Sequence, residues 1–269
     1  MHDIINSEQN SKIKYLKKLY DRRKRRDEGK FILEGYRIIE EALKAQARID
    51  NVFMTPDFLK SKQGEDLKIK INNMKDQVSI TVISEKLLEK IADTSSPQGV
   101  IALANEKKYD LESLFDRAKR LLLIDRVQDP GNMGTIIRTA VAAGIDGILI
   151  LKGSVDIYNL KVLRSTMGAI FNISIIKDLS LDDFFSFYNS NKNEFKLIST
   201  ALNTEKYYYD IEYPDNLIIA IGNEANGLKD EIIKNSDYIV KIPIIGEIDS
   251  LNAAIATGII VYKALEANC

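Results

Sequence analysis

The chain has 269 residues, with 38 lysines and arginines against 39 aspartates and glutamates, and 45% of its residues are hydrophobic. This composition excludes a disordered or fibrous protein and is sufficient for a buried core in one large domain or two unequal ones. The only cysteine is Cys269 and the only histidine is His2, which excludes a disulfide framework, a cysteine or histidine metal site and an imidazole general base.

No apolar signal segment opens the sequence, and the longest apolar run, residues 253–262, is too short to span a bilayer. We therefore expect a cytoplasmic protein without a membrane anchor. Any catalysis therefore has to use groups other than imidazole.

Residues 11–30 are strongly basic although the whole chain is almost neutral, because ten lysines and arginines stand there against three acidic residues. Ile13, Leu16 and Leu19 recur at helical spacing, which predicts an amphipathic helix followed by a basic turn. Such a charge density suits the phosphate backbone of a nucleic acid, and a solvated helix face is the alternative. The candidate RNA contacts in this segment are Lys17, Lys18, Arg22, Arg23 and Arg25.

The first half of the chain has a mixed α/β pattern beyond the basic segment. Apolar runs predict strands at 31–33, 49–54, 78–83 and 99–104, and helical periodicity predicts helices at 36–47 and 85–91. Residues 106–119 are charged and mostly helical in pattern, which is typical of a linker. We therefore expect a smaller domain over residues 1–105, a linker over 106–119 and a second domain over 120–269.

In the second half, predicted strands and helices alternate regularly, which indicates a parallel sheet covered by helices on both faces. The predicted strands are 121–124, 147–151, 173–176, 196–202, 217–221 and 238–242, and the predicted helices are 135–143, 160–167, 181–188, 228–234 and 251–267.

Ligands of open α/β sheets bind beyond the carboxyl ends of the strands, and three loops at such positions have unusual compositions. Residues 125–134 contain a Pro-Gly-Asn turn with Asn132, and Arg138 follows in the next helix, so both side chains could face one cleft. Residues 222–228 place Glu224 between two glycines. The third loop, 243–252, opens with an apolar stretch at 242–245 where an exposed turn should be polar, which indicates the wall of a pocket.

Each of these loops also has a purely structural interpretation. Asn132 could cap a helix while Arg138 pairs with a carboxylate, and Asp249 or Ser250 could cap the last helix. None of the loops fits the dinucleotide or P-loop fingerprints, which argues against a nucleotide-dependent dehydrogenase.

Taken together and in this order, the three segments resemble the three motifs of the SpoU (TrmH) branch of the SPOUT RNA methyltransferases. The segments are residues 125–140, 221–228 and 242–256, with the Asp-Pro-Gly-Asn turn and the Ser-Leu-Asn helix start. The N-terminal part is similar to the small α/β substrate-binding domain that often precedes such enzymes, through the basic helix and the Phe-Ile-Leu-Glu-Gly stretch at 31–35.

The resemblance implies an α/β catalytic domain with a trefoil knot, the cofactor S-adenosylmethionine and a homodimer. It further implies methyl transfer to a ribose 2′-hydroxyl, with ribosomal RNA favoured as the substrate and no metal. The motifs place the polar active-site positions at Asn132, Arg138, Glu224, Ser250 and Asn252. They place the cofactor-binding positions at Thr200, Ala201, Leu202, Gly222, Ile242 and Leu251.

Without a usable histidine, the ribose hydroxyl has to be activated by Arg138 or Glu224. Guanidinium is always protonated, so a phosphate clamp that also stabilises the developing alkoxide suits Arg138 better than the role of base. Glu224 can accept the proton or orient Arg138, while Asn132, Asn252 and Ser250 act as hydrogen-bonding orienters.

A transfer RNA substrate and a non-catalytic RNA-binding protein on the same fold are the alternatives to an enzyme that acts on ribosomal RNA. Arg164, in the helix predicted at 160–167, is a further candidate for RNA contact or else an ion-pair partner on the surface.

Overall fold

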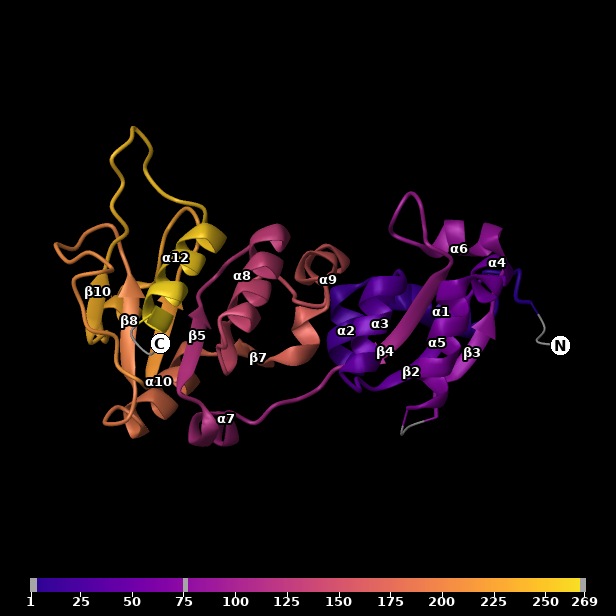
Figure 1. The fold of residues 1–269 in the computed structure, drawn as a ribbon, viewed down its shortest axis with the longest axis horizontal. Helices are drawn as coiled ribbons and strands as arrows, with labels where there is room; N and C mark the ends of the chain where they lie inside the picture. The colour runs from indigo at the N-terminus through magenta and orange to yellow at the C-terminus, as the bar shows by residue number, and fades with distance from the viewer. Residues whose placement is uncertain (1–3, 75–76, 267–269) are drawn as a thin grey trace. The chain divides into compact units, whose positions relative to one another are not determined.

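The computed structural model describes residues 4–74 and 77–266, so His2 and Cys269 lie outside the described residues. The chain forms two compact units (Figure 1). The first consists of Met1–Lys107 together with Tyr158–Phe171, and the second of Lys108–Ile157 together with Asn172–Cys269.

The first unit is built on a four-stranded mixed sheet with the order β1-β4-β2-β3. Its strands are β1 (Lys30–Glu34), β2 (Ile49–Met54), β3 (Ser79–Val82) and β4 (Val100–Asn105), and only β2 and β3 run parallel. Its helices are α1 (Ser11–Lys18), α2 (Arg22–Glu28), α3 (Tyr36–Lys44), α4 (Pro56–Lys60), α5 (Lys62–Asn72), α6 (Glu85–Ile91) and α9 (Leu160–Thr166), with a 3-10 turn at Ala169–Asn172.

The amphipathic helix predicted for the basic segment is confirmed as α1, which buries Ile13 and Leu16 against the sheet. The basic turn predicted after it is instead a second helix, α2, because Asp21 caps it and Gly29 ends it with φ of 63°. Helices α4 and α5 are absent from the sequence-based prediction. Helix α5 buries only Gly64, Leu67 and Ile71 along its eleven residues, a pattern too sparse to stand out in a charged sequence.

The second unit confirms the predicted parallel sheet, since all five strand pairings in its sheet are parallel and the order is β10-β8-β9-β5-β6-β7. The strands are β5 (Arg120–Ile124), β6 (Gly147–Leu151), β7 (Ser174–Leu179), β8 (Lys196–Thr200), β9 (Leu217–Ile221) and β10 (Tyr238–Val240). Strands β6 and β9 are buried along their whole length, as expected of a sheet covered on both faces.

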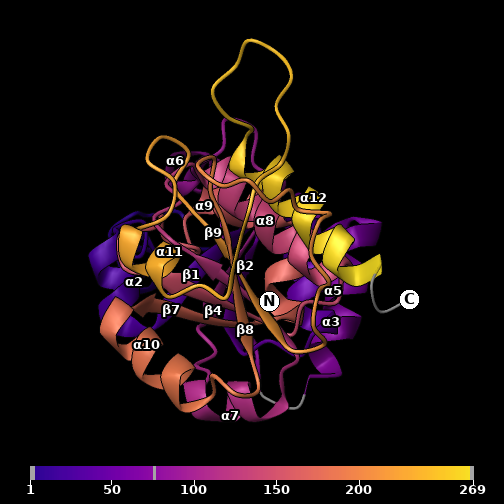
Figure 2. The ribbon, with the colours of Figure 1, turned by 90° about the vertical axis from the view of Figure 1, so that its left-hand side faces the viewer.

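Helices cover both faces of this sheet (Figure 2). On one face, α7 (Leu111–Arg117), α10 (Leu181–Ser190) and α11 (Asp230–Lys234) pack their apolar side chains against alternate residues of the strands, such as Leu121 and Leu123. On the other face, α8 (Pro130–Ala142) and α12 (Ala253–Glu266) pack side by side. No helix among residues 4–74 and 77–266 is long and apolar enough to cross a membrane.

Two helices of the second unit begin at other residues than expected. Helix α8 begins at Pro130 rather than at residue 135, because proline suits the first helical position and Asp129 accepts the backbone N–H of Asn132 as a cap. Helix α12 begins at Ala253, and its cap is neither Asp249 nor Ser250. Asn252 accepts the N–H groups of Ala254 and Ile255 at 2.9 and 3.2 Å.

Candidate active site

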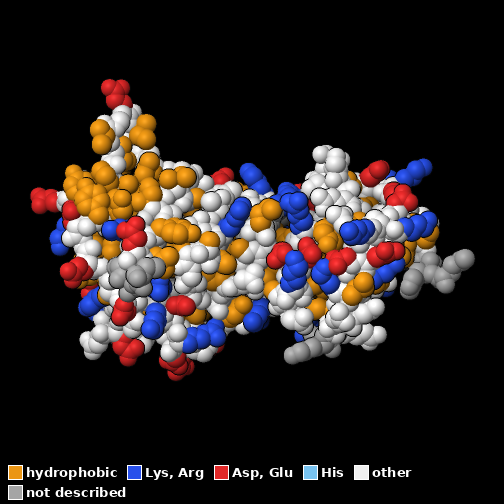
Figure 3. All heavy atoms as spheres, in the orientation of Figure 1, with side chains coloured by type: hydrophobic (Ala, Val, Ile, Leu, Met, Phe, Trp, Pro, Cys, Tyr) orange, Lys and Arg blue, Asp and Glu red, His pale blue; other side chains and the backbone are white. Residues whose placement is uncertain are grey.

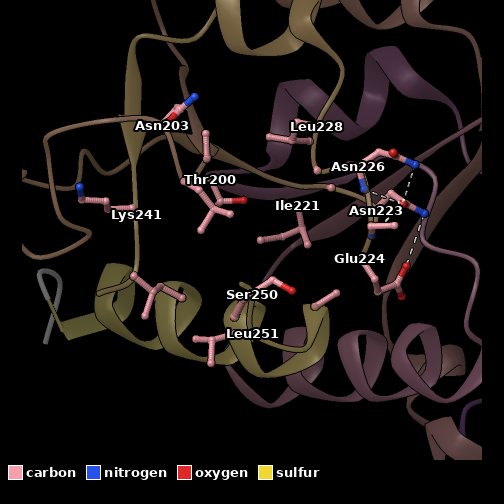
Figure 4. Close-up of a pocket in the computed structure, with 18 of the residues that line it drawn as sticks. Thr200, Asn203, Ile221, Asn223, Glu224, Asn226, Leu228, Lys241, Ser250 and Leu251 are labelled. Atoms are coloured by element: carbon pink, nitrogen blue, oxygen red, sulfur yellow. Dashed lines mark hydrogen bonds between the residues drawn. The ribbon is translucent and has the colours of Figure 1, made fainter. Parts of the chain in front are cut away.

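The site lies at the carboxyl ends of four neighbouring strands of the second unit. Strands β10, β8, β9 and β5 are adjacent in the sheet, so the loops that follow them converge although they are far apart in the sequence. The loops after β8, β9 and β10, with the start of α12, enclose a pocket of about 570 Å³ (Figure 4).

The pocket has an apolar wall and a polar rim. Ile221 and Thr200 lie between Leu228 on one side and Leu251 on the other, and Glu224 and Asn223 stand at one end (Figure 4). All six positions expected to hold the cofactor line it, namely Thr200, Ala201, Leu202, Gly222, Ile242 and Leu251.

The loop after β9 is held closed by its own hydrogen bonds. The backbone groups of Asn223 and Gly227 pair at 2.9 and 3.0 Å, and the side chain of Asn223 accepts the N–H groups of Ala225 and Asn226. The chain crosses itself so closely that a Cβ atom on Gly222 would lie 2.2 Å from the carbonyl carbon of Gly227. Glycine is therefore required at position 222 by close backbone approach.

A buried carboxylate, missed from the sequence, fastens this loop to the end of β5. Asp125 is fully buried and accepts two hydrogen bonds from Arg126, at 3.0 and 3.1 Å, and one from the N–H of Lys229 at 2.9 Å. Arg126 has a φ of 59° and also donates to the carbonyl of Gly227. Its positive φ was not evident from the residue type, since arginine rarely adopts this conformation.

Three of the predicted active-site residues form a hydrogen-bonded chain. Asn252 Nδ2 donates to Asn132 Oδ1 at 2.7 Å, and Asn132 Nδ2 donates to Glu224 Oε1 at 2.8 Å. Because Asn252 Oδ1 caps α12, its Nδ2 is the group left to face Asn132. This fixes which group donates and which accepts at each step of the hydrogen-bonded chain, so that Asn132 presents an N–H donor to the carboxylate of Glu224.

The other two predicted residues do not join this chain. Ser250 is exposed on the rim of the pocket and makes no hydrogen bond within the described part of the protein. Arg138 is exposed on α8, does not line the pocket, and has no ion-pair or hydrogen-bond partner among residues 4–74 and 77–266. A separation of six residues turns a helix by about 240°, so Arg138 and Asn132 lie on different faces of α8.

The predicted RNA contacts of the first unit differ in their environments. Lys18, Arg22 and Arg23 are exposed, and Lys17 pairs with Glu8 at 2.8 Å. Arg25 is only 8% exposed and donates to the carbonyls of Leu19 and Tyr20, so its main contacts are structural.

Arg164 is an ion-pair partner of Asp93 at 3.0 Å, which matches the alternative interpretation of this residue. No group of three or more histidines, cysteines, aspartates or glutamates among the described residues is arranged to hold a metal ion.

Comparison with known proteins matches both halves of the chain. Residues 119–262 match the model of the SpoU rRNA Methylase family, and residues 10–102 match an MRM3-like substrate binding domain. The chain is 32% identical over 259 residues to the 23S rRNA (guanosine(2553)-2′-O)-methyltransferase RlmP of Bacillus subtilis, a match that covers 96% of this chain and 97% of that protein.

Two solved structures with bound AdoMet share the fold over nearly the whole chain. The rRNA methyltransferase from Sinorhizobium meliloti superimposes with a TM-score of 0.85 at 29% identity, covering 98% of this chain and 97% of that one. The SpoU methyltransferase AviRb from Streptomyces viridochromogenes does so with a TM-score of 0.87 at 26% identity, covering 97% and 98%.

Proposed function

This chain belongs to the SpoU rRNA methylase family, and from that membership we propose that it transfers the methyl group of S-adenosylmethionine to a ribose 2′-hydroxyl of RNA. The observation that carries the proposal is that Glu224, the carboxylate end of the Asn252–Asn132–Glu224 hydrogen-bonded chain, lines the pocket. The pocket suits a nucleoside-like cofactor, and the hydrogen-bonded carboxylate suits a hydroxyl that has to lose a proton.

The pocket fits S-adenosylmethionine in size and in chemistry. Its volume of about 570 Å³ lies within the usual range for small-molecule sites, and Ile221, Leu228 and Leu251 offer an apolar surface for an adenine ring. The backbone groups of residues 200–202 and 242 lie at the strand ends, where they can hydrogen-bond the polar parts. When bound, the cofactor supplies an electrophilic methyl group on a sulfonium, which needs neither metal nor acid.

Within this site we propose that Glu224 is the base that accepts the proton of the ribose 2′-hydroxyl. Its Oε1 accepts a hydrogen bond from Asn132 Nδ2. Its Oε2 has only a long contact with Asn223 Nδ2, at 3.5 Å, and is the oxygen offered to the hydroxyl. Asn132 and Asn252 act as positioning residues. Arg138 clamps an RNA phosphate and stabilises the developing alkoxide, a role that its exposure permits.

The proposed substrate is ribosomal RNA, specifically 23S rRNA, on the strength of the similarity to RlmP over both units. The substrate-binding domain model that matches residues 10–102 supports an RNA target larger than the methylated nucleotide. Such a substrate implies a cytoplasmic location.

Transfer of tritiated methyl groups to purified 23S rRNA and to bulk tRNA tests the substrate assignment. We expect incorporation into 23S rRNA at a single ribose, mapped by resistance of the following phosphodiester to alkaline hydrolysis. Incorporation into tRNA alone would redirect the enzyme to tRNA, and no incorporation into either would favour a non-catalytic RNA-binding protein.

We further propose a homodimer formed through the end of the second unit that carries the pocket. Large apolar side chains are exposed there, with Ile245 100%, Ile248 59%, Ile255 56% and Tyr262 47% exposed. Hydrophobic side chains gather over this end and on the loop that projects from it (Figure 3). Such a patch on a monomer is typical of an interface. Light scattering after size exclusion should give twice the mass of 30.4 kDa, and Ile255→Glu should give a monomer.

The division into 1–105, 106–119 and 120–269, with residues 158–171 of the last segment packing in the first unit, and a trefoil knot in that last segment complete the proposal. Limited proteolysis with mass spectrometry tests the boundary, with the first cleavage expected within 106–110, because α7 packs into the core of the second unit.

A further inference from the structure

A second pocket lies entirely within the first unit, and the chemistry proposed above does not use it. Its volume is about 350 Å³. It brings together α2 and the turn before it, strand β1, the bend after α6 and the start of α9. The lining residues are Leu19, Tyr20, Arg25, Ile32, Asp93, Tyr158, Asn159, Leu160, Lys161 and Arg164.

A buried carboxylate holds three walls of this pocket in place. The side chain of Glu34 is 4% exposed, and its Oε1 accepts the Tyr20 hydroxyl at 2.7 Å and the N–H of Asp93 at 2.8 Å. Arg164 approaches Glu34 Oε2 at 4.0 Å and donates to Asp93 at 3.0 Å. Burial, reinforced by Glu34, raises the pKa of the Tyr20 hydroxyl far above its ordinary value, so Tyr20 remains a donor at every physiological pH.

The lining is positively charged. Arg25, Lys161 and Arg164 stand against two carboxylates, Asp93 in the lining and Glu34 behind it. Arg25 and Arg164 are about half the length of the chain apart, yet they line one cavity. Lys161 is exposed at its rim and has no ion-pair or hydrogen-bond partner for its ammonium group within the described residues. The cationic surplus indicates an anionic ligand.

Aromatic rings complete the lining. The ring of Tyr158 stacks on Phe31 with centroids 4.2 Å apart and planes at 20°, and Phe31 is 2% exposed. Phe31 does not line the pocket, so it supports the Tyr158 ring from outside the cavity. A ring held in this way, beside lysine and arginine, is the combination with which proteins bind unpaired nucleotides, by stacking on the base and pairing with the phosphate.

We propose that this pocket binds one unpaired nucleotide of the RNA substrate, with its phosphate on Lys161 and Arg164 and its base against Tyr158. The choice of RNA as the ligand rests on the proposed function. The residues involved are separate from those assigned to methyl transfer, so RNA binding here can be measured without the reaction.

Charge reversal at the rim is the first test. Lys161→Glu should weaken binding of a fluorescein-labelled single-stranded segment of the 23S rRNA substrate about tenfold or more at 0.1 M salt, and should flatten the dependence of affinity on salt. Lys161→Arg should retain the wild-type affinity. Lys60→Glu, the same charge change on α4, which contributes nothing to this pocket, is the matched control and should bind as wild type.

The ring is tested separately. Tyr158→Leu should weaken RNA binding about tenfold, whereas Tyr158→Phe keeps the stacking surface and should stay within twofold. RNA substituted with 4-thiouridine should crosslink to a peptide containing Tyr158 or Tyr20. Circular dichroism of each variant separates loss of binding from loss of folding.

Wild-type RNA affinity in Lys161→Glu and Tyr158→Leu, with crosslinks confined to other peptides, would overturn this inference. So would specific binding of free AMP or GMP that Lys161→Glu abolishes while RNA affinity is unchanged, since the pocket would then serve a mononucleotide. A different result would refute the proposed function: the wild-type protein would methylate no RNA, whatever the RNA affinities of these variants.

Discussion

Asn132 Nδ2 donates to Glu224 Oε1 at 2.8 Å, joining two residues that are 92 positions apart in the chain. The bond connects the start of α8 to the loop after β9. The opposite end of the Asn132 amide accepts from Asn252 at the start of α12, so one amide group aligns all three motifs. The orientation of Glu224 thus depends on how α12 begins.

Removing this amide should disable the reaction while leaving the cofactor pocket intact. Asn132→Ala is expected to lower the rate of methyl transfer about a hundredfold, because Glu224 loses the donor that holds it. S-adenosylmethionine affinity, measured by isothermal titration calorimetry, should change less than threefold. Asn235→Ala, which removes an exposed amide that bonds only the carbonyl of Glu231, is the matched control. Equal loss in both variants would contradict the assignment.

Arg138 offers a contrasting case, because it has no partner among the described residues of the chain. Arg138→Ala should abolish methylation and leave both the thermal midpoint and S-adenosylmethionine affinity nearly unchanged. Lost cofactor affinity in the titration would refute the role of a phosphate clamp. Arg138→Lys should recover only part of the activity, since lysine lacks the bidentate geometry of guanidinium.

Gly222 should tolerate no side chain. In Gly222→Ala the new Cβ would meet backbone atoms of Gly227 and Leu228 at 2.2 and 2.3 Å, so the loop has to open. We expect a loss of about 2–4 kcal/mol in the free energy of unfolding and at least tenfold weaker cofactor binding. Gly246→Ala adds a Cβ with nothing within 4 Å in another loop of the pocket region, and it should behave as wild type in urea titration.

Asp125 should matter for stability as well as for the shape of the pocket. Asp125→Ala leaves Arg126 and the N–H of Lys229 without their acceptor, at a cost of about 3 kcal/mol or more in urea unfolding. Cofactor affinity should fall too, because Arg126 helps to hold the carbonyl of Gly227. Asp116→Ala, at an exposed position of α7, should cost less than about 0.5 kcal/mol.

The pH dependence of stability should include a contribution from Asp237. Burial alone would raise its pKa, but hydrogen bonds from Tyr188, the N–H of Leu197 and Lys196 outweigh burial and lower the pKa below the ordinary value. A carboxyl with a lowered pKa in the folded state stabilises the protein above its unfolded pKa, and this contribution is lost as the pH falls through the folded value. Melting temperatures of wild type and Asp237→Asn should therefore differ at pH 7 and converge below about pH 4. A gap that is constant with pH would contradict this.

The sequence predicted the parallel sheet and the family, because continuous apolar strands and the three motifs are local patterns. It did not predict where the helices beside the site begin. The Pro-Gly-Asn stretch is typical of a turn, yet Pro130 opens α8 because the first helical N–H needs no partner and Asp129 supplies the cap. That arrangement frees the side chain of Asn132 for Glu224.

The pairing of Asn132 with Glu224 and the buried contacts of Asp125 depend on which strands are neighbours. Strands β5 and β9 are adjacent in the sheet, but the sequence separates them by β6, β7 and β8. No spacing rule predicts such an adjacency from one sequence. The same applies to Arg25 and Arg164, whose shared pocket was not foreseen even though each was considered as an RNA contact.

Helix α9 is encoded between β6 and β7, yet it packs on β1 and places Leu160 against the core of the first unit. A fragment ending at Lys107 would keep all four strands of the first sheet and still leave Phe31 without the ring that covers it. The two units therefore cannot be separated by one cut in the polypeptide, and a mutation in the middle of the gene can alter the folding of the part that is translated first.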